Sequence, residues 1–124
     1  MASQTDVRRI ALSLPAVEQR EGRFAFAVRN KGKLKPFVWL WMERVSPKKP
    51  RVPNHDVVAV RVADLAEKDR LLSANATMFF TEPHYDGFPA VLVRLEALSA
   101  AALKRLIKAA WRCQAPVDLN RRTR

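Results

Sequence analysis

The sequence predicts an α+β fold, a two-layer sandwich in which helices cover one face of a five-stranded antiparallel sheet. Three observations lead to this class. Several short segments alternate between apolar and polar residues, as half-buried strands do. Short polar turns join most of these segments, and other segments repeat their apolar residues at helical spacing. The predicted order of elements is α-β-β-β-α-β-β-α, which is typical of a sandwich with segregated helices.

The first helix is predicted over residues 5–14. Its apolar residues follow the i, i+3, i+4, i+7 spacing of one buried stripe: Val7, Ile10, Ala11 and Leu14. Ser3 or Thr5 can cap its start, because a hydroxyl accepts hydrogen bonds from the free amides of the first turn. Pro15 ends the helix, since the residue before a proline avoids the helical region.

Three strands are predicted next, over residues 23–29, 36–43 and 57–62. The first alternates cleanly between its two faces. The second is apolar on both faces, so we expect it to be a central strand. Residues 44–56 contain three prolines among basic side chains, and we expect a mobile basic loop there.

The second half of the chain begins with a helix over residues 65–73. Asp64 is its predicted cap, with Glu67 at the capping-box offset. Two further strands are predicted over residues 77–81 and 89–95, joined by a polar turn that contains Pro83 and Gly87.

The last helix is predicted to start at Ser99, with one apolar side and one basic side. We expect residues 1–118 to form a single domain, because 124 residues leave no room for two ordinary ones. Residues 119–124 are predicted to form a short basic tail with a frayed end.

The charge balance is unusual, with 23 Lys and Arg against 12 Asp and Glu, a formal net charge of +11. Such an excess favours polyanionic partners, which include nucleic acid, acidic lipid and acidic protein surfaces. General solubility is the alternative interpretation. Cys113 is the single cysteine, which excludes an internal disulfide and a cysteine-based zinc site, and we expect it to be buried and inert.

The sequence also indicates a cytoplasmic location. The amino-terminal residues lack the basic and apolar regions of a secretion signal. The longest run of large apolar residues, Phe37 to Met42, is far shorter than the roughly 20 needed to span a bilayer. We therefore expect no membrane partner.

Strand parity predicts which side chains share a face of the sheet. The strongly apolar sets should face the helices, so their neighbours Arg23, Arg29, Arg61 and Arg94 should point away. Trp39 and Trp41 share the parity of the polar residue Glu43. If they also point away from the helices, two indole rings stand among four guanidinium groups on an uncovered face.

Aromatic rings with flanking cations suit nucleic acid, because bases stack on rings and guanidinium groups hold phosphates. Two alternatives stay open at this point. The tryptophans can belong to the core instead, or the same face can be a dimer or protein-interaction surface, since exposed tryptophan and arginine also mark protein contacts.

Two further basic surfaces are candidates for phosphate contacts. The outer side of the last helix has one, and the basic loop has the other. Phosphate contacts position a protein on DNA without reading its sequence. The helix residues are Lys104, Arg105 and Lys108, with Arg112 beside them, and the loop residues are Lys48, Lys49 and Arg51.

The best candidates for catalysis lie on one turn: Glu82, His84, Tyr85 and Asp86. The two carboxylates could act as a base or bind a hard metal, and His84 could carry protons. Their spacing fits no known ligand pattern, and Asp86 followed by Gly87 is typical of a turn, so we favour a structural role. With three glycines and no Gly-x-Ser-x-Gly, the chain has neither a phosphate-binding glycine loop nor that nucleophile motif.

Three stretches together resemble the MmcQ/YjbR family. They are Ala11-Leu12-Ser13-Leu14-Pro15-Ala16-Val17-Glu18, the segment from Phe79 to Leu95, and Ala110-Trp111-Arg112. The resemblance spans about residues 5–117 and implies the same α+β sandwich, an arrangement shared with type III secretion chaperones. The basic proline-rich loop is longer than in many members.

The MmcQ/YjbR family is often described as DNA-binding, because its fold looks like a double-wing domain of a phage transcription factor; this is an analogy of fold. Together with the charge, the resemblance predicts a non-enzymatic DNA-binding protein of low sequence specificity, without metal or cofactor. A protein-interaction module or dimeric adaptor is the alternative.

Overall fold

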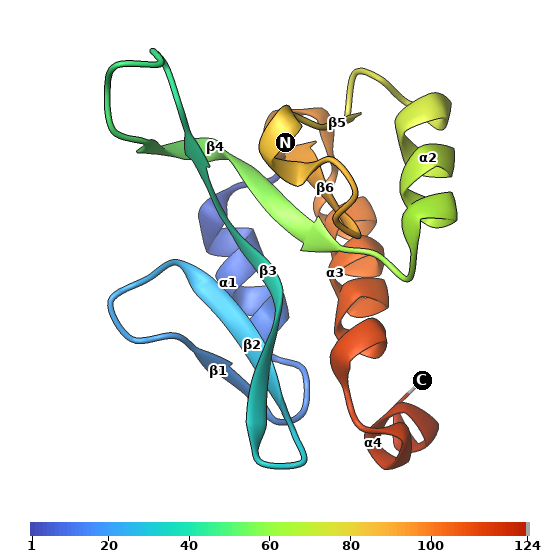
Figure 1. Cartoon of the computed structure of the whole chain (residues 1–124). Helices are drawn as coiled ribbons and strands as arrows, with labels where there is room; N and C mark the ends of the chain where they lie inside the picture. The colour runs from blue at the N-terminus through green and yellow to red at the C-terminus, as the bar shows by residue number, and fades with distance from the viewer. Residues whose placement is uncertain (124) are drawn as a thin grey trace.

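The fold is an antiparallel sheet of six strands with helices packed mainly on one side, as the computed structural model describes it over residues 1–123 (Figure 1). The strand order is β1-β2-β3-β4-β6-β5, and all neighbours are antiparallel. The strands are β1 (Val17–Gln19), β2 (Ala25–Asn30), β3 (Lys33–Glu43), β4 (Val52–Arg61), β5 (Phe79–Phe80) and β6 (Ala90–Arg94).

The helices occupy three places around this sheet. Figure 1 shows α1 and α3 on one face of the sheet, α2 beside the β5–β6 edge, and α4 folded back beyond the end of α3. Two short 3₁₀ turns, η1 and η2, flank β6. The bounds are α1 (Gln4–Leu12), α2 (Leu65–Ala74), η1 (Pro83–Tyr85), η2 (Leu95–Ala97), α3 (Ala100–Gln114) and α4 (Val117–Arg122).

The predicted fold class is confirmed, with one strand more than expected. The additional strand, β1, is a three-residue edge strand that pairs with β2. Ala16 has a φ of 60° and turns the chain from the end of α1 into β1, where its carbonyl accepts a hydrogen bond from the Arg29 amide at 2.9 Å. Three residues are too few for an alternating pattern, so the sequence did not indicate this strand.

Local helix signals agree with the structure. Ser3 caps α1 and forms a capping box with Asp6, and Asp64 and Ser99 cap α2 and α3 through their side-chain oxygens. The Trp111 indole of α3 donates to the Pro15 carbonyl at 3.0 Å, which ties the end of α3 to the chain beyond α1. The predicted start of each of these three helices is therefore accurate to about one residue.

The main core lies between the sheet and the pair α1 and α3. The apolar sides of β2, β4 and β6 face these helices, as strand parity predicts. The fully buried residues of this layer include Val7, Phe26, Val28, Phe37, Val38, Val58, Val60, Val91, Leu103, Ile107 and Trp111.

One residue departs from the predicted parity. Phe37 alternates with Trp39 and Trp41 in the sequence, but it lies in the main core beside Val38. The pairing of β2 with β3 passes from Phe26–Val38 to Ala27–Pro36, so Phe37 is the extra residue of a β-bulge. A bulge breaks the two-residue alternation locally, which lets consecutive side chains enter one core.

The carboxyl-terminal residues form a helix where the sequence predicts a frayed tail. Arg112 of α3 donates to the Asn120 carbonyl and side-chain oxygen, and the Asn120 amide donates to the carbonyls of Arg112 and Ala115. These bonds hold α4 against the end of α3. The predicted tail is therefore wrong for residues 119–122, and Arg124 lies outside the described residues.

Among the described residues, none of the helices is both long and apolar enough to cross a membrane.

Candidate functional site

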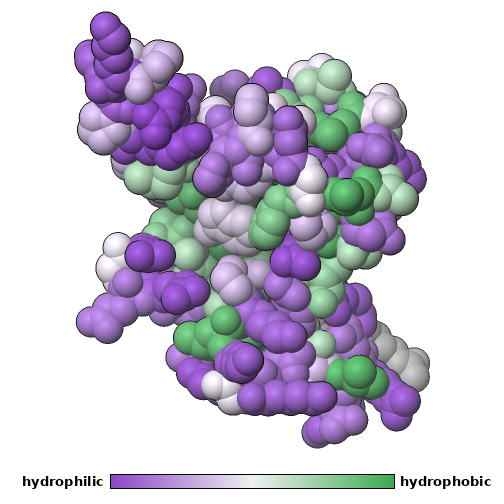
Figure 2. All heavy atoms as spheres, in the orientation of Figure 1, coloured by the Kyte–Doolittle hydropathy of each residue, from purple (hydrophilic) through white to green (hydrophobic). Residues whose placement is uncertain are grey.

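The structure places both candidate tryptophans on the side of the sheet opposite α1 and α3. There they belong to a second, smaller core that is separate from the main one. We call this side of the sheet the tryptophan face; its buried residues are Trp41, Val57, Ala59, Ala90 and Leu92, with Trp39 and Phe80 packed against them. Figure 2 shows the molecule from the same direction as Figure 1, with hydrophilic side chains gathered on the projecting β3–β4 hairpin.

The tryptophan face is partly covered, which corrects the prediction of an uncovered sheet. Residues 82–89, which contain η1, fold over the β4–β6–β5 side, and Tyr85 is buried within the second core. Lys68 of α2 holds this segment in place by donating to the carbonyls of Tyr85 and Phe88. The β2–β3 side is open at a groove instead.

Trp41 lies under this cover and is only 8% exposed. Its indole N–H donates to Glu82 Oε1 at 3.0 Å, and its ring meets Phe80 edge to face at 5.3 Å. Arg51 donates to the same carboxylate oxygen at 3.0 Å. Trp41 is therefore not the exposed ring that the prediction required, and Arg51 is paired with Glu82.

The Glu82 carboxylate is stabilised in its charged form. Burial by itself raises the pKa of Glu82, but the hydrogen bonds from Trp41 and Arg51 and the nearby Arg51 charge outweigh burial. The pKa of Glu82 consequently lies below its ordinary value.

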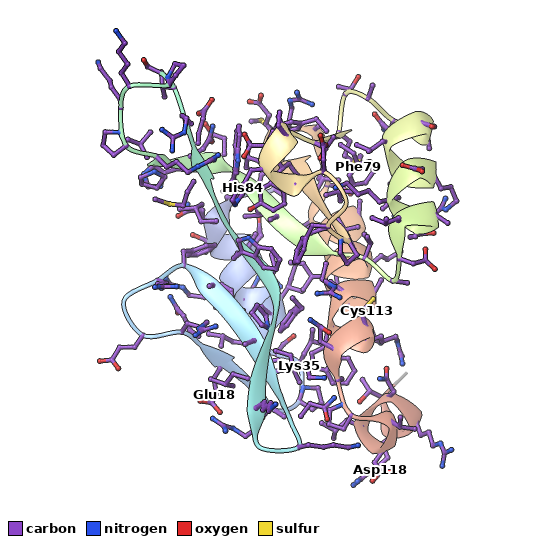
Figure 3. All side chains as sticks on the ribbon, viewed as in Figure 1. Glu18, Lys35, Phe79, His84, Cys113 and Asp118 are labelled. Carbon is purple, nitrogen blue, oxygen red and sulfur yellow. The ribbon has the colours of Figure 1, made fainter. Side chains whose placement is uncertain are left out.

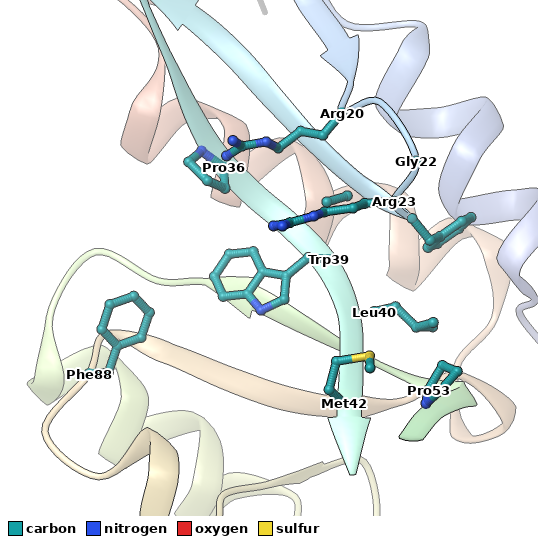
Figure 4. Close-up of a pocket in the computed structure, with 11 residues that line it drawn as sticks. Arg20, Gly22, Arg23, Pro36, Trp39, Leu40, Met42, Pro53 and Phe88 are labelled. Atoms are coloured by element: carbon teal, nitrogen blue, oxygen red, sulfur yellow. The ribbon is translucent and has the colours of Figure 1, made fainter. Parts of the chain in front are cut away.

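Trp39 is half-buried and lies at the boundary between the covered and the open part of the face. Its indole N–H donates to the Tyr85 hydroxyl at 3.1 Å, and its ring meets Phe88 edge to face at 6.4 Å. Figure 4 shows the ring broadside, between Phe88 on one side and Leu40 and Met42 on the other. These contacts orient the indole while leaving part of it open.

A groove of about 730 Å³, which we call the Trp39 groove, lies at the open part of the face. Its lining includes side chains from both faces of the sheet, because Phe24 and Leu40 also pack against the main core. Its walls are mostly apolar, and Met42 and Phe88 remain 44% and 40% exposed. Arg20 and Arg23 are its charged residues, and the described lining residues include no Asp or Glu. The lining residues are Arg20, Gly22, Arg23, Phe24, Ala25, Pro36, Trp39, Leu40, Met42, Pro53 and Phe88.

Arg23 is the one arginine of the predicted four that lines the groove. In Figure 4 its side chain runs alongside the Trp39 ring, and Arg20 reaches toward Pro36. Sequence reasoning missed Arg20. Arg20 lies in the turn just before the predicted strand over residues 23–29, three residues from Arg23. This proximity is the signal that could have identified it.

The other three arginines make intramolecular contacts. Arg61 stacks over Phe88, with 5.4 Å from its guanidinium carbon to the ring centre, and Arg94 stacks over Phe80 at 4.1 Å. Arg94 also donates to the carbonyls of Ala76 and Thr77. Arg29 is exposed and pairs with Glu18 across the β1–β2 ladder at 2.9 Å.

The loop cations lie at the tip of the β3–β4 hairpin. Lys48 and Lys49 are exposed there. Arg44 donates to the carbonyls of Pro47 and Lys49, so the loop has internal hydrogen bonds of its own. Met42 and Pro53, which lie at the foot of the hairpin, also line the Trp39 groove, so the hairpin extends from one end of the groove.

The cations of the last helix lie on the other side of the molecule. Lys104 and Arg105 are exposed and Lys108 is half-buried, all on α3, whose apolar stripe faces the main core. The sheet therefore separates them from the Trp39 groove. The candidate residues form two basic surfaces on opposite sides, and a single straight ligand does not reach both.

The predicted catalytic candidates make structural contacts within and around the η1 turn. Glu82 is bound by Trp41 and Arg51, and Tyr85 accepts from Trp39 and packs edge to face with His84 at 5.5 Å. Gly87 has a φ of 75°, as its turn position requires. Figure 3 shows His84 on this turn, far from Cys113 on α3. Within residues 1–123, no group of three or more His, Cys, Asp or Glu side chains could hold a metal.

Cys113 is exposed, contrary to the prediction of a buried thiol. It lines a second groove of about 470 Å³ between α2 and α3. Its thiol donates to the Ala109 carbonyl, and partial burial raises the pKa of the thiol. The thiol therefore stays protonated near neutral pH.

The fold defines the structural class of the chain. It is shared with the solved structure of Deinococcus radiodurans protein DR2400, which is described as a DUF419 domain. The two agree with a TM-score of 0.64 over 90% of this chain and 78% of that chain, at 16% sequence identity. At this identity the likeness establishes the fold alone.

Curated sequence relatives are bacterial. The chain is 46% identical over 67 residues to uncharacterized protein Rv2570 of Mycobacterium tuberculosis, and to the same extent to uncharacterized protein Mb2600 of Mycobacterium bovis. The match covers 54% of this chain and 52% of each relative, so the chain spans about half the length of the curated relatives it matches. No protein-family model matches the chain.

Proposed function

We propose that the chain is a non-enzymatic, cytoplasmic DNA-binding protein of the MmcQ/YjbR type with low sequence specificity. The observation that carries the proposal is the Trp39 groove, in which aromatic and apolar walls are combined with charged residues of one sign, Arg20 and Arg23. The family type is supported by the resemblance of the three sequence stretches and by the fold shared with a DUF419 domain.

Arginine suits a phosphate ligand because its planar guanidinium donates two parallel hydrogen bonds and remains charged at all relevant pH values. Arg20 and Arg23 are both exposed at the groove. Lys48 and Lys49 extend the positive charge along the hairpin. Contacts of this kind hold a backbone without reading base edges, which accounts for the low sequence specificity that we propose.

Two charge-reversal variants test the role of the groove. We expect Arg20→Glu/Arg23→Glu to weaken DNA binding at low salt at least tenfold. Lys104→Glu/Arg105→Glu is the matched control, because it changes the net charge equally on the opposite side of the sheet, and we expect it to retain most of the affinity. Fluorescence anisotropy of a labelled oligonucleotide measures both.

The comparison separates a localised site from bulk charge. Equal losses in the two variants would mean that net charge alone drives binding, and would contradict the groove. Absence of DNA binding by the unmodified protein at low salt would refute the function itself. Circular dichroism of both variants verifies that they are folded.

A protein-interaction module or dimeric adaptor is the second candidate, favoured by the exposed apolar side chains of Met42 and Phe88 in the same groove. Light scattering distinguishes the two. A stable dimer that Met42→Glu dissociates, with no DNA binding, would favour this candidate. Trp41→Glu is unsuitable as a probe, because Trp41 is buried and its replacement would disturb the fold.

A further inference from the structure

The Trp39 ring is a surface on which a ligand can stack, and its neighbours hold the ring in place. The indole N–H is bound to the Tyr85 hydroxyl, so the ring cannot rotate freely. Figure 4 shows its broad side between Phe88 and Met42, with the Arg23 side chain along its edge. By contrast, Trp41 is only 8% exposed and Trp111 is fully buried, so neither offers a ring face to a ligand.

The face of an aromatic ring binds unpaired bases in preference to paired ones. In a duplex, neighbouring base pairs cover both faces of each base, and only the edges reach the grooves. An unpaired base has a free face, and stacking on an aromatic side chain is tolerant of its identity. A groove whose walls are apolar and aromatic therefore suits a single strand better than a duplex.

The size and charge of the groove agree with this ligand. Its volume of about 730 Å³ lies within the roughly 300–1,000 Å³ typical of sites for small organic groups. Arg20 and Arg23 lie beside the apolar walls, where the phosphates of a nucleotide with a buried base would lie. Beyond Met42 and Pro53, the hairpin leads to Lys48 and Lys49, which can contact further phosphates of the same strand.

We propose that the Trp39 groove binds single-stranded DNA, with an unpaired base stacked against Trp39 and phosphates held by Arg20 and Arg23. The proposal rests on the proposed function and narrows its ligand from DNA in general to unpaired DNA. The low sequence specificity follows from stacking, because every base has a ring face.

A pair of substitutions at one position isolates the stacking. Trp39→Phe and Trp39→Leu both remove the hydrogen bond to Tyr85, but only Trp39→Phe retains an aromatic ring. We expect Trp39→Leu to bind labelled oligothymidylate roughly five- to hundredfold more weakly than Trp39→Phe does. We expect the same two variants to differ little on the duplex of oligothymidylate with oligoadenylate.

A spectroscopic signature accompanies the affinity. Trp39 is the most exposed of the three tryptophans, so stacking of a base should quench the intrinsic fluorescence of the unmodified protein. Both variants lack the Trp39 indole, so they should lose most of the fluorescence quenching while still binding. Quenching that persists in both variants would place the bound base elsewhere.

The outcomes separate this inference from the proposed function. Tighter binding of the single strand than of the duplex, with the expected difference between the two variants, supports the inference. Equal binding of single-stranded and duplex DNA, with no difference between the two Trp39 variants, overturns the inference. The proposed DNA-binding function still stands in that case if Arg20→Glu/Arg23→Glu binds DNA more weakly than the unmodified protein. A failure to bind either form at low salt overturns both.

Discussion

Glu82 joins residues that are far apart in the sequence. Its Oε1 atom accepts from the Trp41 indole and from the Arg51 guanidinium, both at 3.0 Å. Arg51 donates in addition to the Met42 carbonyl at 2.7 Å. A charged acceptor that receives two donors in a mostly buried setting stabilises the fold more than an exposed ion pair does. Glu82 therefore fastens the η1 segment to the foot of the β3–β4 hairpin.

We expect Glu82→Gln to lower the free energy of unfolding by about 1–3 kcal/mol at neutral pH, because the two hydrogen bonds at this oxygen lose their charged acceptor. The folded-state pKa of Glu82 lies below the ordinary 4.5, so the carboxylate contributes stability that is complete above that pH. This contribution is lost as the pH falls through the folded pKa. Urea unfolding at neutral and acidic pH measures the difference.

Glu96→Gln is the control for this change, because Glu96 is exposed. It should leave the free energy of unfolding within about 0.5 kcal/mol at either pH. If Glu82→Gln were as stable as the unmodified protein at neutral pH, the carboxylate would not be the stabilising group.

At the scale of elements, η1 controls how much of the tryptophan face is open. The turn is held from three directions: by Lys68 of α2, by the Trp39 indole of β3 and by the bonds of Glu82. Lys68 is buried, and desolvation lowers the pKa of its amine. A buried lysine is tolerated here because its ammonium group donates to two carbonyls.

We expect Lys68→Ala to destabilise the protein by about 1–3 kcal/mol, because the carbonyls of Tyr85 and Phe88 each lose a donor. Residues 82–89 should also exchange their amide hydrogens faster, while the strands of the main core stay protected. Urea unfolding and hydrogen exchange measure the two effects. Lys104→Ala, at an exposed position on a helix, is the control; equal exchange in both variants would contradict the role of Lys68.

At the scale of the whole molecule, the positive charge is divided between two sides of the sheet. Arg20, Arg23, Lys48 and Lys49 lie along the Trp39 groove and the hairpin, while Lys104 and Arg105 lie on α3. The net charge of +11 attracts polyanions over a distance of about 10 Å at moderate salt. The side that contacts the DNA then decides which lysine and arginine side chains displace counterions from its phosphates.

Salt dependence measures how many of these cations contact DNA. If the four cations of the groove and hairpin each neutralise a phosphate, the logarithm of affinity should fall against the logarithm of salt concentration with a slope of about −3 for single strands. The slope should become shallower for Arg20→Glu/Arg23→Glu. A slope near zero in the unmodified protein would contradict phosphate binding.

Several features could be predicted from short stretches of sequence. Ser3, Asp64 and Ser99 cap the helices as their hydroxyl or carboxylate chemistry indicates. The alternation of β2, β4 and β6 also predicts which side faces α1 and α3. These signals act between residues a few positions apart, so the sequence displays them directly. The fold class follows from these signals, whereas parity alone leaves open whether Trp39 and Trp41 face away from the helices or belong to the core.

The exposure of individual side chains could not be predicted from local patterns. Parity places Trp39 and Trp41 on one face, but Trp41 lies beneath Glu82, which is 41 positions away in the sequence. Stacking of Arg61 on Phe88 and of Arg94 on Phe80 likewise depends on how strands and turns meet. The bulge that sends Phe37 into the main core shifts the register, which no local pattern of apolar residues reveals.

The amino-acid sequence by itself determined the class of fold, the helix caps and the net positive charge, because local periodicity and composition govern these. Tertiary structure decided that Trp39 and Trp41 lie opposite α1 and α3, that η1 covers part of that side, that Arg20 joins Arg23 beside Trp39, and that the α3 cations face the other way. The physical reason is that burial and proximity depend on contacts between distant segments, which form only when the whole chain packs.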